Sequence, residues 1–263
     1  MFTAQDHTFA LCAYGEGPYL RECIASLKDQ SVASHIILCT STPNGWIEDA
    51  ARQADIELFV SGEAPGIAHD WNYALSCADT PLVTIAHQDD VYCAPYAEAM
   101  LEAMNDAERP LLFFTNYGEL RDGEPVDDNR LLAVKRKLLR PLEDKANRAD
   151  VRVRRRVLSL GSAICCPSVT MVVDALPYPV FQDGMKSNLD WEAWERISHL
   201  SGEFLYDPRI LMYHRIHEGS ETSALIKDNT RTAEDREMLR RFWPAPIAWA
   251  LNLAHGLGRK SNG

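Results

Sequence analysis

Short apolar runs alternate with helical patterns through the first half of the chain. The apolar runs, which are typical of buried strands, cover residues 8–14, 35–40, 56–61, 81–86 and 111–115. Between them, apolar residues recur at helical spacing in segments 18–30, 46–54, 66–78 and 95–104. Strands that alternate with helices in this way indicate βαβ units and a mostly parallel sheet. The hydrophobic pattern therefore predicts an α/β fold.

The second half of the chain has a less regular pattern. Residues 120–156 are polar and basic and contain one helical candidate, 129–139. The apolar stretch 157–173 is interpreted as buried strands broken at Gly161 and Pro167. Further along, the pattern predicts one helix and then two short strands, at about 191–201, 203–207 and 210–214.

Polar segments follow the first, second and fourth predicted strands, at residues 13–16, 40–42 and 87–90. Ligands bind beyond the carboxyl ends of the strands in such sheets, so we expect these segments to share one crevice. The third segment contains Asp89 and Asp90. A divalent cation that also binds nucleotide phosphates prefers hard carboxylate oxygens of this kind. The alternative is that the acidic pair merely forms a turn.

A second acidic cluster begins at Asp190, directly before a helical pattern. A carboxylate fixed at the start of a helix suits a general base, and the alternative is that it caps the helix. We interpret Trp191 as either a core residue or a platform for a sugar ring. Glu192 and Glu195 are expected on a solvated helix face.

Two histidines, His214 and His217, lie near a predicted strand end and could supply one metal or phosphate ligand. The alternative is a packed, hydrogen-bonded role. The sequence contains no G-x-S-x-G motif, no Walker loop and no G-x-G-x-x-G motif. Serine-hydrolase, P-loop and dinucleotide-binding chemistry are therefore not indicated.

The charge is unevenly distributed along the 263 residues. The formal net charge is −11, which argues against a general nucleic-acid binder because phosphate neutralisation needs a basic surface. Residues 135–156 nevertheless carry ten lysines and arginines against three acidic residues. Such a run is usually solvated, but its density, with Arg155 and Arg156 next to an apolar stretch, also suits a diphosphate or an anionic lipid.

The seven cysteines include no C-x-x-C spacing, so we expect buried free thiols in a reducing cytosol. The N-terminus lacks a basic segment before its short apolar run, and no signal peptide is predicted. After Pro246, Ile247, Leu251 and Ala254 share one helical face, followed by basic residues. This face is expected to pack onto the domain, and contact with a membrane surface is the alternative.

Four segments, in this order, resemble family 2 glycosyltransferases of the GT-A fold. "FALCAYGEGPYLRECIASLKDQS" is similar to the opening strand, loop and helix, and "GIAHDWNYALSCADTPLVTIAHQDDVY" to the segment that ends in the D-x-D motif. "NLDWEAWERI" resembles the acidic catalytic motif, and "YHRIHEGSETS" resembles the R-x-H segment. The resemblance covers roughly residues 8–223.

The resemblance implies a role for each matching residue. Asp190 would be the general base, Asp89 would hold Mg²⁺ or Mn²⁺ on the donor diphosphate, and Asp90 and His217 would be further metal contacts. Donor-binding positions are expected at Ala13, Tyr14, Glu16, Thr40, Ser41, Asn72, Gln88 and Asp89. Contacts to the diphosphate or the acceptor are expected from Arg155, Arg156 and Trp191.

Three positions depart from the family pattern. His87 stands where the first aspartate of D-x-D is usual, and Leu189 replaces an acidic neighbour of the catalytic aspartate. The segment "CTSTPNG" replaces an acidic segment after the second strand. The architecture implied by the resemblance survives these changes, whereas metal affinity and nucleoside preference depend on them.

The resemblance thus implies an inverting transfer of a sugar from a nucleotide-sugar donor, with a UDP-sugar expected first, to a hydroxyl group of a glycan or glycolipid. We expect one continuous domain, in which 1–120 binds the nucleotide sugar and 121–263 forms a smaller acceptor-side extension with the catalytic residue. A cytoplasmic location with peripheral association at the inner face of the membrane is expected. A sugar nucleotidyltransferase and a non-catalytic sugar-nucleotide-binding module are the competing functions.

Overall fold

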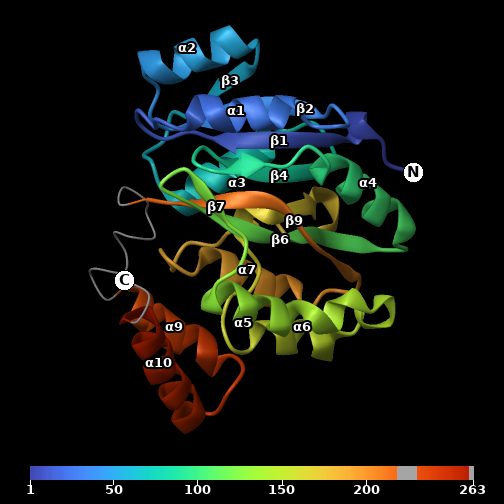
Figure 1. Ribbon diagram of the computed structural model, residues 1–263, viewed down its shortest axis with the longest axis vertical. Coiled ribbons are helices and arrows are strands. Elements are labelled where there is room, and N and C mark those ends of the chain that lie inside the picture. Colours follow the sequence, from blue (N-terminus) through green and yellow to red (C-terminus); the bar gives the residue numbers. More distant parts are fainter. Residues whose placement is uncertain (218–229, 261–263) are drawn as a thin grey trace.

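The computed structural model describes residues 1–217 and 230–260, with side chains described up to residue 256. Its first half contains four parallel strands with helices between them (Figure 1). The strands are β1 His7–Cys12, β2 His35–Thr40, β3 Glu57–Val60 and β4 Leu82–His87. The helices are α1 Leu20–Lys28, α2 Gly45–Ala54 and α3 Ile67–Cys77. Each strand and helix predicted in this region is confirmed, with small shifts at the ends.

The second half completes one mixed sheet with the strand order β3-β2-β1-β4-β8-β6-β9-β5, and β7 pairs with β6. These strands are β5 Val91–Tyr92, β6 Pro110–Arg121, β7 Glu124–Val126, β8 Val169–Val172 and β9 Glu203–Ile216. β8 runs antiparallel to both β4 and β6, and so joins the parallel half to the parallel pair β6 and β9. The predicted α/β class is therefore confirmed.

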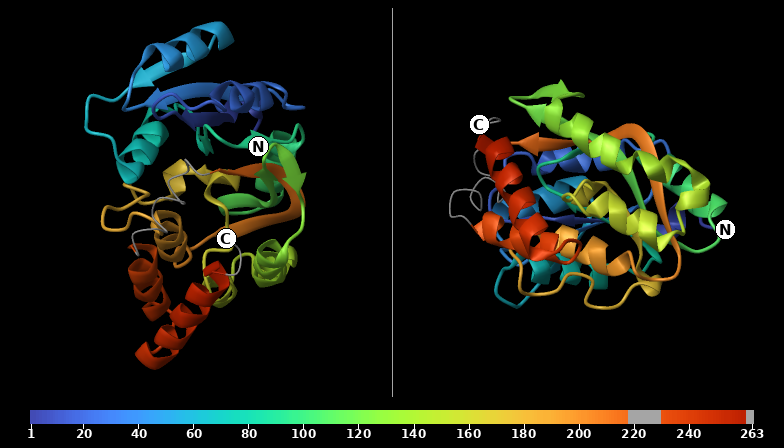
Figure 2. Two further views of the ribbon diagram at one scale, coloured as in Figure 1. Left: turned by 60° about the vertical axis from the view of Figure 1, so that its left-hand side comes forward. Right: turned by 90° about the horizontal axis from the view of Figure 1, so that it is seen from below.

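The remaining helices are α4 Tyr96–Asp106, α5 Arg130–Leu139, α6 Val151–Leu158, α7 Leu189–Ile197, α9 Thr230–Arg240 and α10 Ala245–Lys260. Two core clusters form, one under α1 and α4 and the other under α3, α6 and α7. Figure 2 shows α9 and α10 lying at the end of the molecule farthest from α2. The sheet between the two clusters is buried on both faces, which explains its near-continuous apolar runs.

The basic stretch forms a second helix, α6, which the sequence analysis missed. The Asp150 side chain accepts a hydrogen bond from the Arg152 amide and caps this helix. Arg154 is fully buried, donates to the Leu200 carbonyl at 2.8 Å, and lies 5.2 Å from the centre of the Phe204 ring. Because a charged residue occupies a buried position of this helix, its hydrophobic pattern was interrupted and the segment was interpreted as solvated.

Two other predictions in the second half are wrong. The buried strands expected in 157–173 reduce to β8, because α6 runs to Leu158 and a short 3-10 helix occupies Cys166–Ser168. The two strands expected around residue 208 form the single strand β9, with an irregularity where it pairs with Asn116. The Asn116 side chain donates to the Pro208 carbonyl at 2.6 Å and so satisfies a carbonyl at the irregularity.

The α7 acids Glu192 and Glu195 are buried, each 7% exposed, so the solvated face predicted for them is also wrong. Arg241, in the turn after α9, pairs with both carboxylates, at 3.0 Å and 3.3 Å. Arg155 of α6 pairs with Glu195 at 2.5 Å. Paired charges tolerate burial, so these contacts fix α7 against α6 and the C-terminal helices.

The C-terminal helix α10 packs on the domain, as predicted, but only Leu251 of the three predicted residues contacts the core. Ala248 is fully buried, whereas Ile247 is 46% exposed and Ala254 is also exposed. His255 lies 2.9 Å from the Leu160 carbonyl, and the Trp243 indole donates to the Ser159 carbonyl at 2.7 Å. Among the described residues, no helix combines the length and the apolar character needed to cross a membrane.

Candidate active site

The segments that follow β1, β2 and β4 meet at the carboxyl edge of the sheet, as predicted. The Gly15 amide donates to the Thr42 hydroxyl at 2.9 Å. The Tyr14 amide donates to the Gln88 side chain at 3.1 Å, and that side chain donates back to the Tyr14 carbonyl at 3.0 Å. Side chains of the second and third segments thus hold the backbone of the first.

Close packing explains the glycine at position 17. A Cβ atom at Gly17 would lie 2.7 Å from the Gln88 side chain, so a larger residue would displace Gln88. The Trp46 indole donates to the Gly17 carbonyl at 3.0 Å and fixes the other side of the loop. Gly15 has φ +59°, a conformation that glycine adopts easily. The loop geometry therefore depends on its glycines.

The predicted donor positions on these loops differ in exposure. Tyr14 is 56% exposed, and Glu16 is also exposed, so both are available to a ligand. Ala13 and Thr40 are buried, and the Thr40 hydroxyl accepts a hydrogen bond from the Thr42 amide at 3.0 Å. Ser41 is partly buried and its hydroxyl has no partner among the described residues.

Asp90 anchors the acidic loop from inside the protein. It is 1% exposed, and its Oδ1 lies 2.9 Å from His214 Nδ1 and accepts from the Arg215 amide at 3.0 Å. Burial alone would raise the pKa of Asp90, but His214, His87 and the Arg215 amide together hold that pKa below its ordinary value of 3.8. An ionised Asp90 therefore ties β9 to the end of β4.

Asp89 is the accessible carboxylate of the pair, with 26% of its side chain exposed. Its Oδ2 lies 3.1 Å from His217 Nε2. The Tyr19 ring meets the His217 ring edge-on, with 5.4 Å between the ring centres. The described part of the R-x-H segment thus contacts the acidic loop, and the rest of that segment, 218–223, lies outside the described residues.

Arg215 is the arginine of the R-x-H segment, for which the sequence alone predicted no separate role. Its guanidinium donates to the Asp89 carbonyl at 2.8 Å and to the Glu22 carboxylate at 2.7 Å, and it lies 4.1 Å from the centre of the Tyr19 ring. These contacts connect β9, α1 and the acidic loop. Its position as the arginine of the R-x-H motif was the available signal.

Asp190 lies in the first turn of α7, two residues after the actual cap position, Asn188. Its Oδ1 accepts from the Trp191 amide at 2.7 Å, and its Oδ2 accepts from the Ser162 hydroxyl at 3.2 Å. Burial raises the pKa of Asp190, and this exceeds the opposing effects of the Trp191 amide, Arg231, Lys135 and Ser162. A carboxylate whose pKa is raised by burial is a stronger base than an exposed aspartate.

Glu234 of α9 holds the loop that leads to Asp190. Its buried carboxylate accepts three backbone hydrogen bonds, from Lys186 at 2.7 Å, Ser187 at 2.8 Å and Asn188 at 3.0 Å. The sequence offered no sign of this contact, because it joins residues 46 to 48 positions apart. Hydrogen bonds to a charged acceptor are among the stronger ones.

Replacing Glu234 with glutamine is expected to destabilise the protein by about 1–3 kcal/mol, because an amide NH₂ would then face backbone N–H groups. The measurement is urea denaturation followed by circular dichroism. Glu237→Gln, an exposed change one turn later on α9, is the matched control. Equal unfolding midpoints for the two variants would contradict this role for Glu234.

Several predicted site residues lie elsewhere. Trp191 is 1% exposed and its indole donates to the Leu158 carbonyl, so it packs in the core and offers no platform to an acceptor. Arg155 is held by Glu195 and His199, and Arg156 is exposed on α6. Asn72 is buried and spans from α3 to the backbone of Phe181.

The structure does not gather Asp89, Asp90 and His217 into a metal-binding cluster. Within the described parts of the chain, no group of three or more histidine, cysteine or acidic side chains could hold a metal ion. Asp90 Oδ1 is occupied by His214 and Arg215, and its Oδ2 is buried 3.9 Å from His87, so Asp89 and His217 are the accessible adjacent potential ligands. Two ligands suit a cation whose coordination is completed by substrate oxygens.

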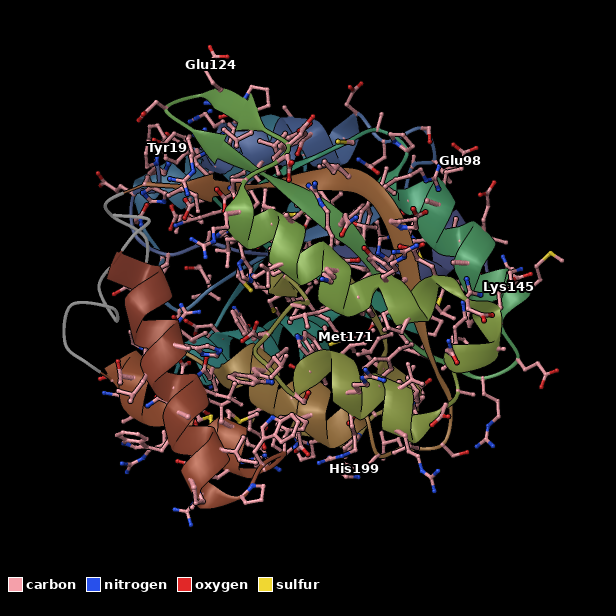
Figure 3. All side chains as sticks on the ribbon, turned by 60° about the horizontal axis from the view of Figure 1, so that its bottom comes forward. Tyr19, Glu98, Glu124, Lys145, Met171 and His199 are labelled. Carbon is pink, nitrogen blue, oxygen red and sulfur yellow. The ribbon has the colours of Figure 1, made fainter. Side chains whose placement is uncertain are left out.

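Part of the basic stretch lies far from this site (Figure 3). Tyr19, which contacts His217, and Lys145, which pairs with Asp106 at 2.6 Å, lie on opposite sides of the view. Arg148 also pairs with Asp106, at 3.3 Å. Much of the predicted basic surface is therefore occupied by internal ion pairs far from the acidic loop.

Comparisons with known proteins agree with this fold. The chain superposes on a Pyrobaculum calidifontis mannosyltransferase, PcManGT, solved with GDP-Man and Mn²⁺, with a TM-score of 0.62 and 14% identity, covering 98% of this chain and 76% of that chain. Glucosyl-3-phosphoglycerate synthase from Mycobacterium tuberculosis, solved with Mn²⁺, UDP and phosphoglyceric acid, gives a TM-score of 0.57 and 14% identity over 91% and 80% of the two chains.

A third similar structure is Staphylococcus aureus TarS. TarS 1-349 in complex with UDP-GlcNAc gives a TM-score of 0.58 and 13% identity, covering 94% of this chain and 70% of that chain. Against another TarS structure, the match covers 97% of this chain but only 43% of that chain, so this chain spans less than half the length of that relative. No curated protein matches the sequence.

The sequence profile described as glycosyl transferase family 2 matches residues 8–158. This range includes the three strand-end loops and the acidic pair, and the solved structures share the GT-A fold beyond it. The chain belongs to glycosyltransferase family 2 and is a glycosyltransferase.

Proposed function

We propose that this glycosyltransferase transfers a sugar from a nucleotide-sugar donor to a hydroxyl group with inversion, and that Asp190 is its general base. The observation that carries the proposal is the environment of Asp190, a carboxylate whose pKa is raised by burial. In this proposal, residues 1–120 supply the donor-binding loops after β1, β2 and β4, and residues 121–263 supply the general base on α7.

The donor is proposed to lie over the carboxyl edge of β1, β2 and β4. The exposed ring of Tyr14 offers a stacking surface for a nucleobase, and Glu16 and Gln88 offer polar contacts nearby. The relatives were solved with UDP, UDP-GlcNAc and GDP-Man, which supports a nucleoside diphosphate sugar, with UDP-sugars as the first to test.

Asp89 and His217 would hold a divalent cation, Mg²⁺ or Mn²⁺, together with the donor diphosphate. Imidazole and carboxylate together suit Mn²⁺, and the Mn²⁺ present with two relatives supports this choice. Such a cation, when bound, neutralises charge on the departing nucleoside diphosphate. His87 stacks on Trp71, with 5.1 Å between ring centres, and lies beside this position in place of an aspartate.

The chain's own residues explain how Asp190 would work as the base. The Trp191 amide and the Ser162 hydroxyl fix the two carboxylate oxygens. Asp190 then accepts the proton of the acceptor hydroxyl while that oxygen attacks the anomeric carbon. The hydroxyl of a glycan or glycolipid is the proposed acceptor, and peripheral contact with the inner face of a membrane is proposed with it.

We predict that the pH dependence of kcat/KM reports Asp190. Burial raises the pKa of this carboxyl above 3.8, so the base is protonated and inactive below its pKa and becomes active as the pH rises through it. The acid limb is therefore expected at a higher pH than that of an ordinary aspartate. Initial rates at saturating donor, measured between about pH 4 and pH 9, locate this acid limb. An acid limb at or below the ordinary aspartate value would contradict the assignment.

A further inference from the structure

The C-terminal helix α10 exposes an apolar face. Between Pro244 and His255 the sequence contains no charged residue. The exposed side chains in this range are all apolar, and Ile247, Trp249 and Leu253 are 46%, 59% and 50% exposed. A helix that borders water usually turns charged and polar residues outward. The surface called here the α10 apolar face consists of Pro246, Ile247, Trp249, Ala250, Leu253 and Ala254.

Contacts on the opposite side of α10 hold this face away from the rest of the protein. Ala248 is fully buried, and Leu251 packs against the core. Asn252 donates to the Thr232 carbonyl of α9 at 3.2 Å. Positions 248, 251, 252 and 255 recur at helical spacing, and so do 246, 249, 250 and 253, about half a turn away. The packing of the helix therefore fixes which residues it exposes.

Exposed cations lie near this helix. Arg156 lies on α6, one turn before Leu160, whose carbonyl lies 2.9 Å from His255 of α10. Arg236 and Arg240 lie on α9, which packs along α10. None of these three arginines forms an ion pair within residues 1–217 and 230–256. The apolar face is thus accompanied by positive charge, a combination typical of helices that bind at a membrane surface.

The charge of the whole chain is divided in the same sense. Figure 1 shows α5, α6, α9 and α10 at one end of the molecule. Segments 135–156 and 218–263, which include α6, α9, α10 and most of α5, carry 17 lysines and arginines against nine acidic residues. The rest of the chain carries 10 against 29. An anionic surface would therefore attract the end that bears α10 and repel the remainder.

The same helix is connected to the acceptor side of the candidate site. His255 contacts the Leu160 carbonyl, and Ser162, two residues later, donates to Asp190 at 3.2 Å. Glu234 of α9 holds the loop before Asp190. A surface that contacts α10 would therefore lie on the side of the protein from which the proposed base is held.

We propose that the α10 apolar face docks the protein on a membrane that contains anionic lipids, with α10 lying in the plane of the membrane surface. Tryptophan suits this boundary because its ring is apolar and its indole N–H is polar. The inference rests on the proposed function for its acceptor side, where it favours a glycolipid over a soluble glycan. It names the surface and the lipid class of the proposed membrane contact.

The test is co-sedimentation of the full chain with vesicles of phosphatidylcholine, with or without phosphatidylglycerol. The wild type should bind the anionic vesicles more tightly than the neutral ones. Trp249→Gln and Leu253→Gln should each weaken this binding at least about tenfold, because each removes a large apolar side chain from the contact. Trp249→Phe, which keeps an aromatic ring, should retain most of it.

Charge variants test the second part of the proposal. Arg156→Gln and Arg240→Gln should each weaken binding to the anionic vesicles about fivefold, the effect of one basic residue near such a surface. Val60→Gln on β3 and Arg52→Gln on α2 replace exposed residues at the opposite end of the molecule and should leave binding unchanged. Thermal unfolding of each variant verifies that it is folded.

No binding of the wild type to anionic vesicles would overturn the docking surface, and so would an equal loss in Val60→Gln and Trp249→Gln. Equal binding to neutral and anionic vesicles would overturn the lipid class. A wild-type dimer that Trp249→Gln dissociates, without vesicle binding, would assign the face to a second copy of the chain. Vesicle binding needs neither donor nor acceptor, so normal vesicle binding without binding of any nucleotide would contradict the proposed function alone.

Discussion

Replacing Asp190 with asparagine is expected to lower the rate of sugar transfer by about 10²- to 10⁴-fold, the usual contribution of a general base. The amide keeps the shape of the side chain and can still contact Ser162 and the Trp191 amide, but it cannot accept the acceptor proton. Donor affinity should stay within about twofold, since the donor is bound by other loops. Steady-state rates with a saturating donor and calorimetry with the nucleotide measure the two quantities.

Asp183→Asn is the matched control for this variant, because Asp183 is an exposed aspartate shortly before α7. It should transfer sugar at the wild-type rate. Near-normal turnover in Asp190→Asn would show that another group is the base. A similar loss in both aspartate variants would indicate a general effect on the segment before α7 and would also contradict the assignment.

Replacing Asp89 with alanine is expected to reduce kcat/KM at least about 100-fold, because the cation at the donor diphosphate would lose its accessible carboxylate ligand. The loss should appear both in donor binding and in metal dependence. Rates measured over a series of Mn²⁺ concentrations should show a much weaker metal response in the variant than in the wild type.

Asp79→Asn, at the opposite end of β4, is the control for position 89, because Asp79 is exposed and lies before the strand begins. The Asp89 assignment fails if the variant keeps the metal response of the wild type. Equal activity of the wild type with Mn²⁺ and with a chelator would contradict the proposed requirement for a metal ion. It would not affect the assignment of Asp190 as the general base.

The first half of the fold could be predicted from the sequence because most residues of β1, β2 and β4 are buried and its helices are amphipathic. Segment 35–40 has an apolar centre, residues 36–39, and it forms β2 with the same bounds. The second half could not be predicted as well, because its local pattern is overridden by long-range contacts. Arg154 is fully buried in α6, where its guanidinium finds a carbonyl at Leu200, 46 residues away.

The contacts of the candidate site also differ in how well the sequence predicts them. Loops at strand ends follow from the parallel topology, so the convergence of Tyr14, Thr42 and Gln88 could be predicted. Contacts that join distant segments could not, as when Glu234 of α9 holds the loop before Asp190. The sequence marked the basic stretch as unusual, but it could not show that Lys135 contacts Tyr117 while Arg155 pairs with Glu195.

The most direct test of the central claim is a measurement of nucleotide release from UDP-, GDP-, dTDP- and CDP-sugars, each with Mn²⁺ or with chelator, and with binding of each donor measured in parallel. A nucleotide-sugar-dependent transferase is expected to bind one donor class and to release its nucleoside diphosphate with Mn²⁺, and release should be lost in Asp89→Ala. Tight binding without release, even with acceptors present, would instead indicate a non-catalytic sugar-nucleotide-binding module. Failure to bind any of the four donor classes would contradict the donor site at the carboxyl edge of β1, β2 and β4.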